Sequence, residues 1–162
     1  MAEGLYGQVS KAWKKPKQNL GEIYRSRLIQ MRREPSIIRV DRPTRINRAR
    51  SLGYKAKLGY IVSRVKIGRG GRRRKLYGRG GRKPSKAGLV NFTHTKSLQK
   101  IAEERALRRY INTFVLGSYL VGADGKHKWF EVVMADTQHP NIRNDPKARW
   151  MSSPASRKRA FR

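Results

Sequence analysis

The stretch TFVLGSYLVGADGKHKWFEVVMAD, residues 113–136, decides the fold class of this sequence. Its two halves, 113–121 and 128–136, are rich in β-branched and aromatic residues, which are typical of strands. Asp124-Gly125 between them is a strong hairpin signal, because glycine accepts the positive φ that tight turns use. The stretch therefore predicts an antiparallel hairpin that supplies most of the core, with four mostly buried aromatic residues: Phe114, Tyr119, Trp129 and Phe130.

Outward from the hairpin, two segments have clear periodicity. Residues 60–67 alternate, with Ile61, Val65 and Ile67 on one face and Arg64 and Lys66 on the other, which predicts a strand. Residues 97–110 place apolar side chains at helical spacing, and Glu104 precedes Arg108 by four residues, so this segment is expected to be a helix.

The remaining elements are predicted mainly from residues that begin or end helices and turns, such as proline and capping residues, rather than from the periodicity of apolar residues. Residues 6–34 are expected to form two helices, separated at Pro16 and ended by Pro35, before a short strand at 36–40. Thr44 is expected to cap a helix that ends at Gly53, and Asp145-Pro146 to begin a short turn. The fold class is therefore α+β in a single domain over 1–162, with a small antiparallel sheet, packed helices and long basic, Gly/Arg-rich extensions.

Charge identifies the class of partner. The chain holds 40 Lys and Arg against 10 Asp and Glu, a formal net charge of +30, and there is no acid between Arg42 and Ala102. A chain with this charge repels itself unless a polyanion neutralises it. Arginine is the commoner base, which favours bidentate phosphate contacts and stacking on bases.

The segment GRGGRRRKLYGRGGRKP, residues 68–84, contains GRGGR twice. Neither a P-loop nor a dinucleotide fingerprint matches its spacing, and its arginines carry too much charge for one small ligand. Glycine lets the backbone pass close to phosphates, while arginine neutralises them. We therefore expect a basic RNA-penetrating loop at 68–91 that becomes ordered on binding, and a second basic extension in the tail at 152–162.

The sequence gives no support for an active site, a cofactor-binding site or a metal site. Cysteine is absent, and the three histidines, His94, His127 and His139, lack the spacing of metal ligands. Asp136 and His139 could be two ligands of a metal or part of an acid-base pair, but no third group completes a site. No apolar run is long enough to cross a membrane and no export signal begins the chain, so we expect an intracellular protein without small-molecule substrate or membrane partner.

Three segments together resemble a known family: RPTRINRARSLGYKAKLGYIVSRVKIGRGGRRR at 42–74, SLQKIAEERA at 97–106 and KWFEVVMAD at 128–136. The chain is similar, over nearly its whole length, to the fifteenth large-subunit ribosomal protein of the archaeal and eukaryotic series. The resemblance implies a structural, non-catalytic role in cytoplasmic ribosomes, with large-subunit rRNA and neighbouring ribosomal proteins as partners and no homo-oligomer. It also implies a further Gly-rich basic tail beyond Arg162, which the given sequence does not contain.

The candidate RNA-binding residues follow from the resemblance and from the basic segments. The resemblance implies contacts from Arg42, Arg45, Arg48, Arg50, Lys55, Lys57, Arg69, Arg72, Arg79 and Arg82. Flanking charges extend the set to Lys14, Lys15, Arg73, Arg74, Lys75, Lys83, Lys86, Arg157 and Arg159, and Tyr54 and Tyr77 are candidates for stacking on unpaired bases.

Three other functions compete with this interpretation. A loosely binding, disordered RGG-type linker fits the segment at 68–84 taken alone. A DNA-compacting protein would also be small, basic and free of cysteine, although no groove-reading motif is recognisable. An RNA-modifying enzyme would require a cofactor loop or a carboxylate constellation, and neither is recognisable.

Exchange of Arg69, Arg72, Arg79 and Arg82 for lysine tests whether the GRGGR copies act through geometry or through charge alone. Because an ammonium cannot bridge phosphates or stack as a guanidinium does, we expect a loss of about 1 kcal/mol or more in rRNA binding at fixed salt. The matched alanine variant should lose more and should also flatten the salt dependence. Filter binding over a salt series measures both effects, and equal affinities of the wild type and the lysine variant would reduce the segment to an electrostatic linker.

Overall fold

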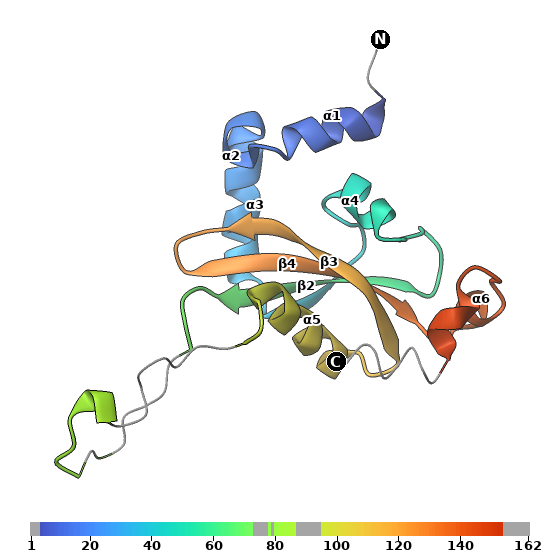
Figure 1. The fold of residues 1–162 in the computed structure, drawn as a ribbon. Coiled ribbons are helices and arrows are strands. Elements are labelled where there is room, and N and C mark those ends of the chain that lie inside the picture. The colour runs from blue at the N-terminus through green and yellow to red at the C-terminus, as the bar shows by residue number, and fades with distance from the viewer. Residues whose placement is uncertain (1–3, 73–77, 79, 87–94, 154–162) are drawn as a thin grey trace.

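The computed structural model describes residues 4–72, 78, 80–86 and 95–153. Its helices are α1 (Leu5–Ala12), α2 (Pro16–Asn19), α3 (Gly21–Arg33), α4 (Ile46–Ser51), α5 (Leu98–Arg109) and α6 (Pro140–Arg143), with short 3-10 turns η1 (Pro84–Lys86) and η2 (Arg149–Ser152). Its strands are β1 (Ile37–Val40), β2 (Tyr60–Gly68), β3 (Thr113–Ala123) and β4 (His127–Asp136). The α+β class is confirmed (Figure 1).

A four-stranded antiparallel sheet in the order β1-β2-β4-β3 forms the centre of the molecule. The predicted hairpin is β3–β4, and β2 pairs along its whole length with β4, from Tyr60 opposite Ala135 to Gly68 opposite His127. Every residue from Trp129 to Ala135 is buried. The segment that decides the fold class therefore also provides the innermost strand.

The hairpin turn is formed by Asp124 rather than by a glycine with positive φ. Gly125 is not among the glycines with positive φ in the described residues. The Asp124 carboxylate instead accepts hydrogen bonds from the backbone N–H groups of Lys126 and His127, at 2.7 and 2.6 Å. Aspartate side chains stabilise turns by such local bonds. The turn was predicted at the right place, but for the wrong reason.

Helices cover both faces of the sheet (Figure 1). On one face, α3 and α4 pack on Tyr119, Val121, Trp129 and Val133. On the other face, α5 packs through Ala102 and Ala106. Its partners are the side chains of β2 and β4 that point to that face: Val65, Ile67, Phe130, Val132 and Met134. The helix predicted over 97–110 is α5, which begins at Leu98 and is capped by Ser97, whose side chain accepts a hydrogen bond from the Lys100 N–H.

Two glycines of β3 allow α3 and the end of α4 to approach closely. A Cβ at Gly122 would lie 2.8 Å from Leu28 of α3, and one at Gly117 would lie 2.9 Å from Leu52. Real Cβ atoms do not approach this closely, so a larger residue at either position would force the leucine side chain, or the helix that carries it, to move.

A smaller cluster closes one end of the sheet, where Ala135 packs with Ile142, Ala148 and Met151. Asp145 caps the predicted turn here, because its carboxylate accepts from the Lys147 N–H at 3.0 Å. The helix α6 was not predicted. His139 caps it by accepting from the Asn141 N–H at 3.2 Å.

Three sequence expectations need correction or lie partly outside the described residues. Thr44 does not cap α4, and the first turn of α4 has no side-chain cap. The Thr44 hydroxyl instead donates a hydrogen bond to the Glu131 carboxylate. Glu104 pairs with Lys96, at 2.6 Å, rather than with Arg108. Of the basic segments, residues 73–77, 79, 87–91 and 154–162 lie outside the described residues, so an extended form for both segments remains a prediction. In Figure 1 the described turn η1 lies away from the sheet.

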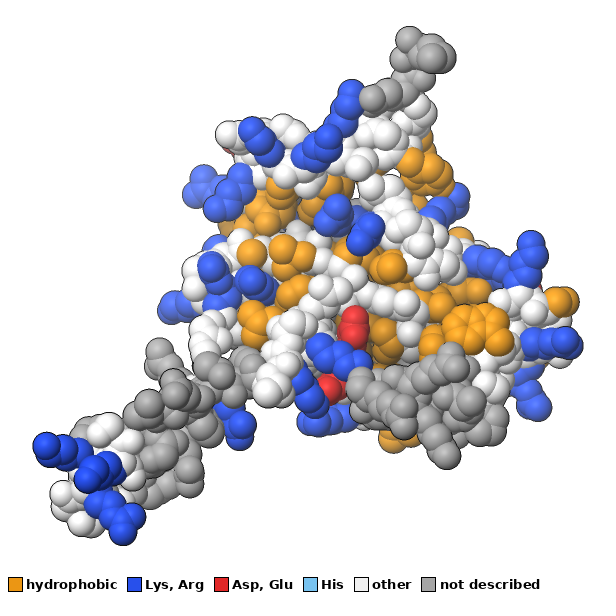
Figure 2. All heavy atoms as spheres, viewed as in Figure 1, with side chains coloured by type: hydrophobic (Ala, Val, Ile, Leu, Met, Phe, Trp, Pro, Cys, Tyr) orange, Lys and Arg blue, Asp and Glu red, His pale blue; other side chains and the backbone are white. Residues whose placement is uncertain are grey.

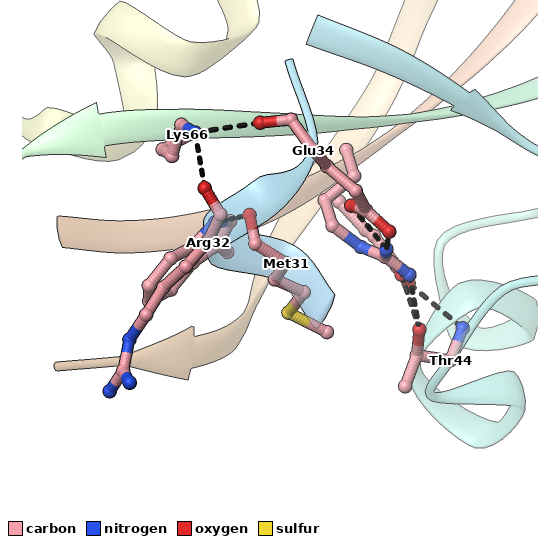
Figure 3. A network of polar contacts seen from close by, with 8 residues as sticks. Met31, Arg32, Glu34, Thr44 and Lys66 are labelled. Atoms are coloured by element: carbon pink, nitrogen blue, oxygen red, sulfur yellow. Dashed lines mark hydrogen bonds and ion pairs between the residues drawn. The ribbon is translucent and has the colours of Figure 1, made fainter. Parts of the chain in front are cut away.

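A polar network joins α3, the sheet and the loop before α4 (Figure 3). The fully buried Glu131 accepts hydrogen bonds from the Thr44 N–H and hydroxyl, from Arg64, and from the Tyr119 hydroxyl. Arg64 also binds both carboxylate oxygens of Glu34, which follows α3, at 2.9 and 3.0 Å. Figure 3 shows Lys66 donating to the carbonyls of Arg32 and Glu34 at the end of α3.

We expect Glu131→Gln to lower the free energy of unfolding by about 2–4 kcal/mol, because an amide offers one acceptor oxygen to donors that converge on two, and Arg64 keeps its charge. Urea denaturation followed by circular dichroism measures the loss. The matched control is Glu104→Gln, which breaks a pair with the exposed Lys96. It should cost less than about 1 kcal/mol. Equal losses would show that the buried network has no special weight.

Candidate nucleic-acid interface

The acidic side chains of the described residues are mostly engaged within the protein. Besides Glu34 and Glu131, Glu103 accepts from the Ser118 hydroxyl, Glu104 from Lys96, Asp124 from Arg32, Asp136 from the Gln138 N–H and Asp145 from two lysines. Figure 2 shows Lys and Arg side chains around the periphery of the face it presents, with few acidic atoms between them. The outer surface is therefore left strongly basic.

The helix α4 and the residue before it carry three predicted contact residues, and the structure separates their roles. Arg48 is exposed and forms no ion pair among the described residues. Arg45 is half-buried: it donates to the Leu120 carbonyl at 3.1 Å, and its guanidinium lies 5.1 Å from the centre of the Trp13 ring. Arg50 stacks on the Tyr6 ring at 5.6 Å and bonds to its hydroxyl. Arg45 and Arg50 thus hold α1 against α4.

The environment of Arg45 supports a structural role. Burial, with a smaller effect from the neighbouring charge of Arg48, lowers the pKa of Arg45 from its ordinary value. A half-buried guanidinium that already stacks on an indole and binds a carbonyl has fewer N–H groups available to a phosphate than Arg48 has.

Lys55 and Lys57 meet at Asp145, with each ammonium 3.1 Å from the same carboxylate oxygen. The hydrogen bonds from Lys55 and then Lys57 hold the pKa of Asp145 far below its ordinary range, and the bond to Asp145 raises the pKa of Lys55. Both lysines remain exposed, so they keep ammonium N–H groups for an outside anion while anchoring the loop before β2.

Tyr54 is half-buried rather than presented to solvent. It packs against the cluster beneath α3, and its ring meets that of Tyr60 edge-to-face with centroids 6.2 Å apart. Only part of the ring therefore remains for a base.

The other predicted residues divide by location. Lys14, Lys15 and Arg42 are exposed, as are Arg72, Arg82, Lys83 and Lys86. Arg69 is fixed at the base of the GRGGR segment, because its guanidinium donates to the Asp124 carbonyl at 2.7 Å and its N–H to the Lys126 carbonyl at 2.8 Å. The remaining seven lie outside the described residues: Arg73, Arg74, Lys75, Tyr77, Arg79, Arg157 and Arg159.

Sequence reasoning missed bases on regular elements that join this surface. Arg27 of α3 and Arg39 of β1 line, with the predicted Arg42, a groove of about 430 Å³ beside Glu34 and Arg64. The available signal was Arg39 itself, the one base and the one exposed residue in the otherwise apolar strand IIRV. The basic surface thus includes a helix and a strand as well as loops.

The described residues contain no group of three or more His, Cys, Asp or Glu side chains placed to hold a metal ion. Asp136 and His139 each bind a backbone N–H of the turn that follows β4. No helix of the described residues is long and apolar enough to cross a membrane.

These features define a small, strongly basic α+β protein whose carboxylates stabilise the fold and whose cations face outward. The family model described as Ribosomal L15 matches residues 4–162. The large ribosomal subunit protein eL15 of Methanocella arvoryzae is 47% identical over 163 residues, an alignment that covers 100% of this chain and 83% of that protein. The chain belongs to the eL15 family of large-subunit ribosomal proteins.

Membership confirms the resemblance and fixes the broad role. The protein is a structural constituent of the large ribosomal subunit, it is located in cytoplasmic ribosomes, and it is not an enzyme.

Asp145→Asn tests the lysine pair at the end of the sheet. Because its pKa is lowered on folding, the Asp145 carboxylate stabilises the fold above its unfolded pKa of about 3.9, and this contribution is lost as pH falls below that value. The free energy of unfolding of the wild type should therefore exceed that of the variant at pH 7, and the difference should shrink between about pH 5 and pH 2. Curves that run parallel across this range would contradict the role assigned to Asp145.

Proposed function

We propose that this protein stabilises the large subunit by binding rRNA phosphates through the outward bases of α4, of the loops that flank it and of the GRGGR segment. The observation that carries the proposal is the separation of charge: seven acidic side chains have partners inside the fold, while Lys14, Arg42 and Arg48 are exposed without an ion pair among the described residues. Cations without internal partners are available to phosphates.

Phosphate contacts position a protein on RNA without reading its sequence, which is the task of a structural constituent. The exposed charges come from segments far apart in the chain, so one copy contacts several stretches of backbone at once. The proposed contacts include the predicted residues outside the described part of the chain. Neighbouring ribosomal proteins are proposed as further partners, and self-association is disfavoured by the repulsion of a +30 chain.

A DNA-compacting role is the second candidate by composition. It lacks a supporting observation, because such proteins use repeated or dimeric groove-reading units and membership in a large-subunit family points to rRNA.

Joint replacement of Lys14, Arg42 and Arg48 by glutamine tests the proposal. Each lost phosphate contact should lower the slope of log K against log salt by about 0.9 for a duplex-like site, so we expect a total decrease of about 2–3. Filter binding to deproteinised large-subunit rRNA measures the slope, and circular dichroism checks the fold.

Arg45→Gln is the matched control for this variant. It removes one positive charge that already has partners in the fold, so it should lower the melting temperature while leaving the salt slope nearly unchanged, well below the change of about 0.9 expected for one lost contact. A triple variant with the slope of the wild type would contradict phosphate binding by these three residues.

A further inference from the structure

A groove of about 700 Å³ lies where α2, the β3–β4 turn and the start of the GRGGR segment meet. Lys15 and Lys17 border it from α2 and its preceding residue, and Arg69 borders it from the end of β2. Three bases from two distant parts of the sequence therefore face one cavity. Its volume falls in the range of sites that hold a small molecule or one unit of a polymer.

The acid at the groove is already neutralised. Asp124 lines the groove, but its carboxylate accepts from Arg32 at 3.0 Å and from the N–H groups of Lys126 and His127. Burial alone would raise the pKa of Asp124; these hydrogen bonds outweigh it and hold the pKa below the ordinary value. The net field in the groove comes from the three bases, and it favours an anion.

The groove also has features that a bare phosphate would not use. Tyr24, which is 7% exposed, contributes an aromatic side chain, and Gln18 contributes an exposed amide. The Tyr24 hydroxyl accepts from the Ala123 N–H at 3.3 Å, and its own hydrogen donates to no group among the described residues. An aromatic side chain, an amide and cations together suit an unpaired nucleotide, whose base contacts apolar atoms while its phosphates meet the cations.

We propose that this groove binds one unpaired nucleotide of the rRNA, with its flanking phosphates at Lys15, Lys17 and Arg69 and its base toward Tyr24 and Gln18. The proposal rests on the rRNA binding proposed above and adds a defined site to it. Arg69 has a particular place in this site, because its bond to the Asp124 carbonyl fixes the guanidinium at the groove and leaves its other N–H groups to a phosphate.

A crosslinker placed at the groove tests the proposal. The chain contains no cysteine, so Gly125→Cys gives a unique thiol for azidophenacyl bromide. A Cβ at Gly125 meets no atom within 4 Å, so the label enters open space. The full-length labelled protein is bound to deproteinised large-subunit rRNA and irradiated, and the crosslinks are mapped by primer extension. Asn144→Cys, an exposed site directly after α6, which follows the C-terminal end of β4, is the matched control.

We expect the label at position 125 to mark one nucleotide, or two adjacent ones, that is reactive to base-pairing probes in free rRNA and protected in the complex. Lys15→Gln/Lys17→Gln in the same background should reduce this crosslink about tenfold per bound protein. Lys100→Gln/Lys147→Gln removes the same charge elsewhere and should leave the crosslink unchanged.

The outcomes separate this site from rRNA binding in general. If the wild type fails to bind rRNA in the filter assay, both proposals fail. If it binds, but the crosslinks fall on paired helices, scatter widely or persist in the Lys15→Gln/Lys17→Gln variant, the nucleotide site fails and rRNA binding stands. If position 125 crosslinks to a protein rather than to RNA in reconstituted subunits, an acidic protein segment fills the groove and the proposal is overturned.

Discussion

The carboxylate of Glu131 is the constraint on which the rest of the structure depends. It lies fully buried in the innermost strand, where an unpaired charge would cost several kcal/mol. Its partners therefore have to be in place: Thr44 from the loop before α4, Arg64 from β2 and Tyr119 from β3. Burial, with the neighbouring charge and hydrogen bond of Glu131, raises the pKa of Tyr119 and keeps it a donor. Through Arg64 the network also holds Glu34 after α3.

The same use of carboxylates helps a chain with 40 basic and only 10 acidic residues to fold despite the repulsion between its bases. Acids stand at joints between elements: Asp124 at the β3–β4 turn, Asp145 where the loop before β2 meets the turn after α6, and Glu131 in the sheet. Each draws in bases that would otherwise repel one another. The bases that remain exposed, such as Lys15, Arg42 and Arg48, then lie on the outside of the molecule.

The sequence predicted what local pattern determines. The β3–β4 hairpin, the alternation of β2 and the start of α5 directly after Ser97 depend on neighbours a few residues away. It failed where the partner is distant: Thr44 meets Glu131 87 residues later, and Arg45 meets Leu120 75 residues later. The sequence identifies Arg45 and Lys55 as bases. No periodicity in it reveals that Arg45 stacks on the Trp13 indole or that Lys55 forms an ion pair with Asp145.

Sequence patterns also do not reveal which bases lie together on the basic surface. In the sequence, Lys15 belongs to an N-terminal basic run and Arg69 to the first GRGGR copy, and nothing links them. The fold brings both to one groove because the β3–β4 turn lies beside the start of α2 and the end of β2 there, and Arg69 is bonded to the Asp124 carbonyl. An acid that stabilises a turn thus also sets the position of a base at the surface. The nucleotide site proposed here is therefore a property of the tertiary structure, and counting charges along the chain captures only the electrostatic part of it.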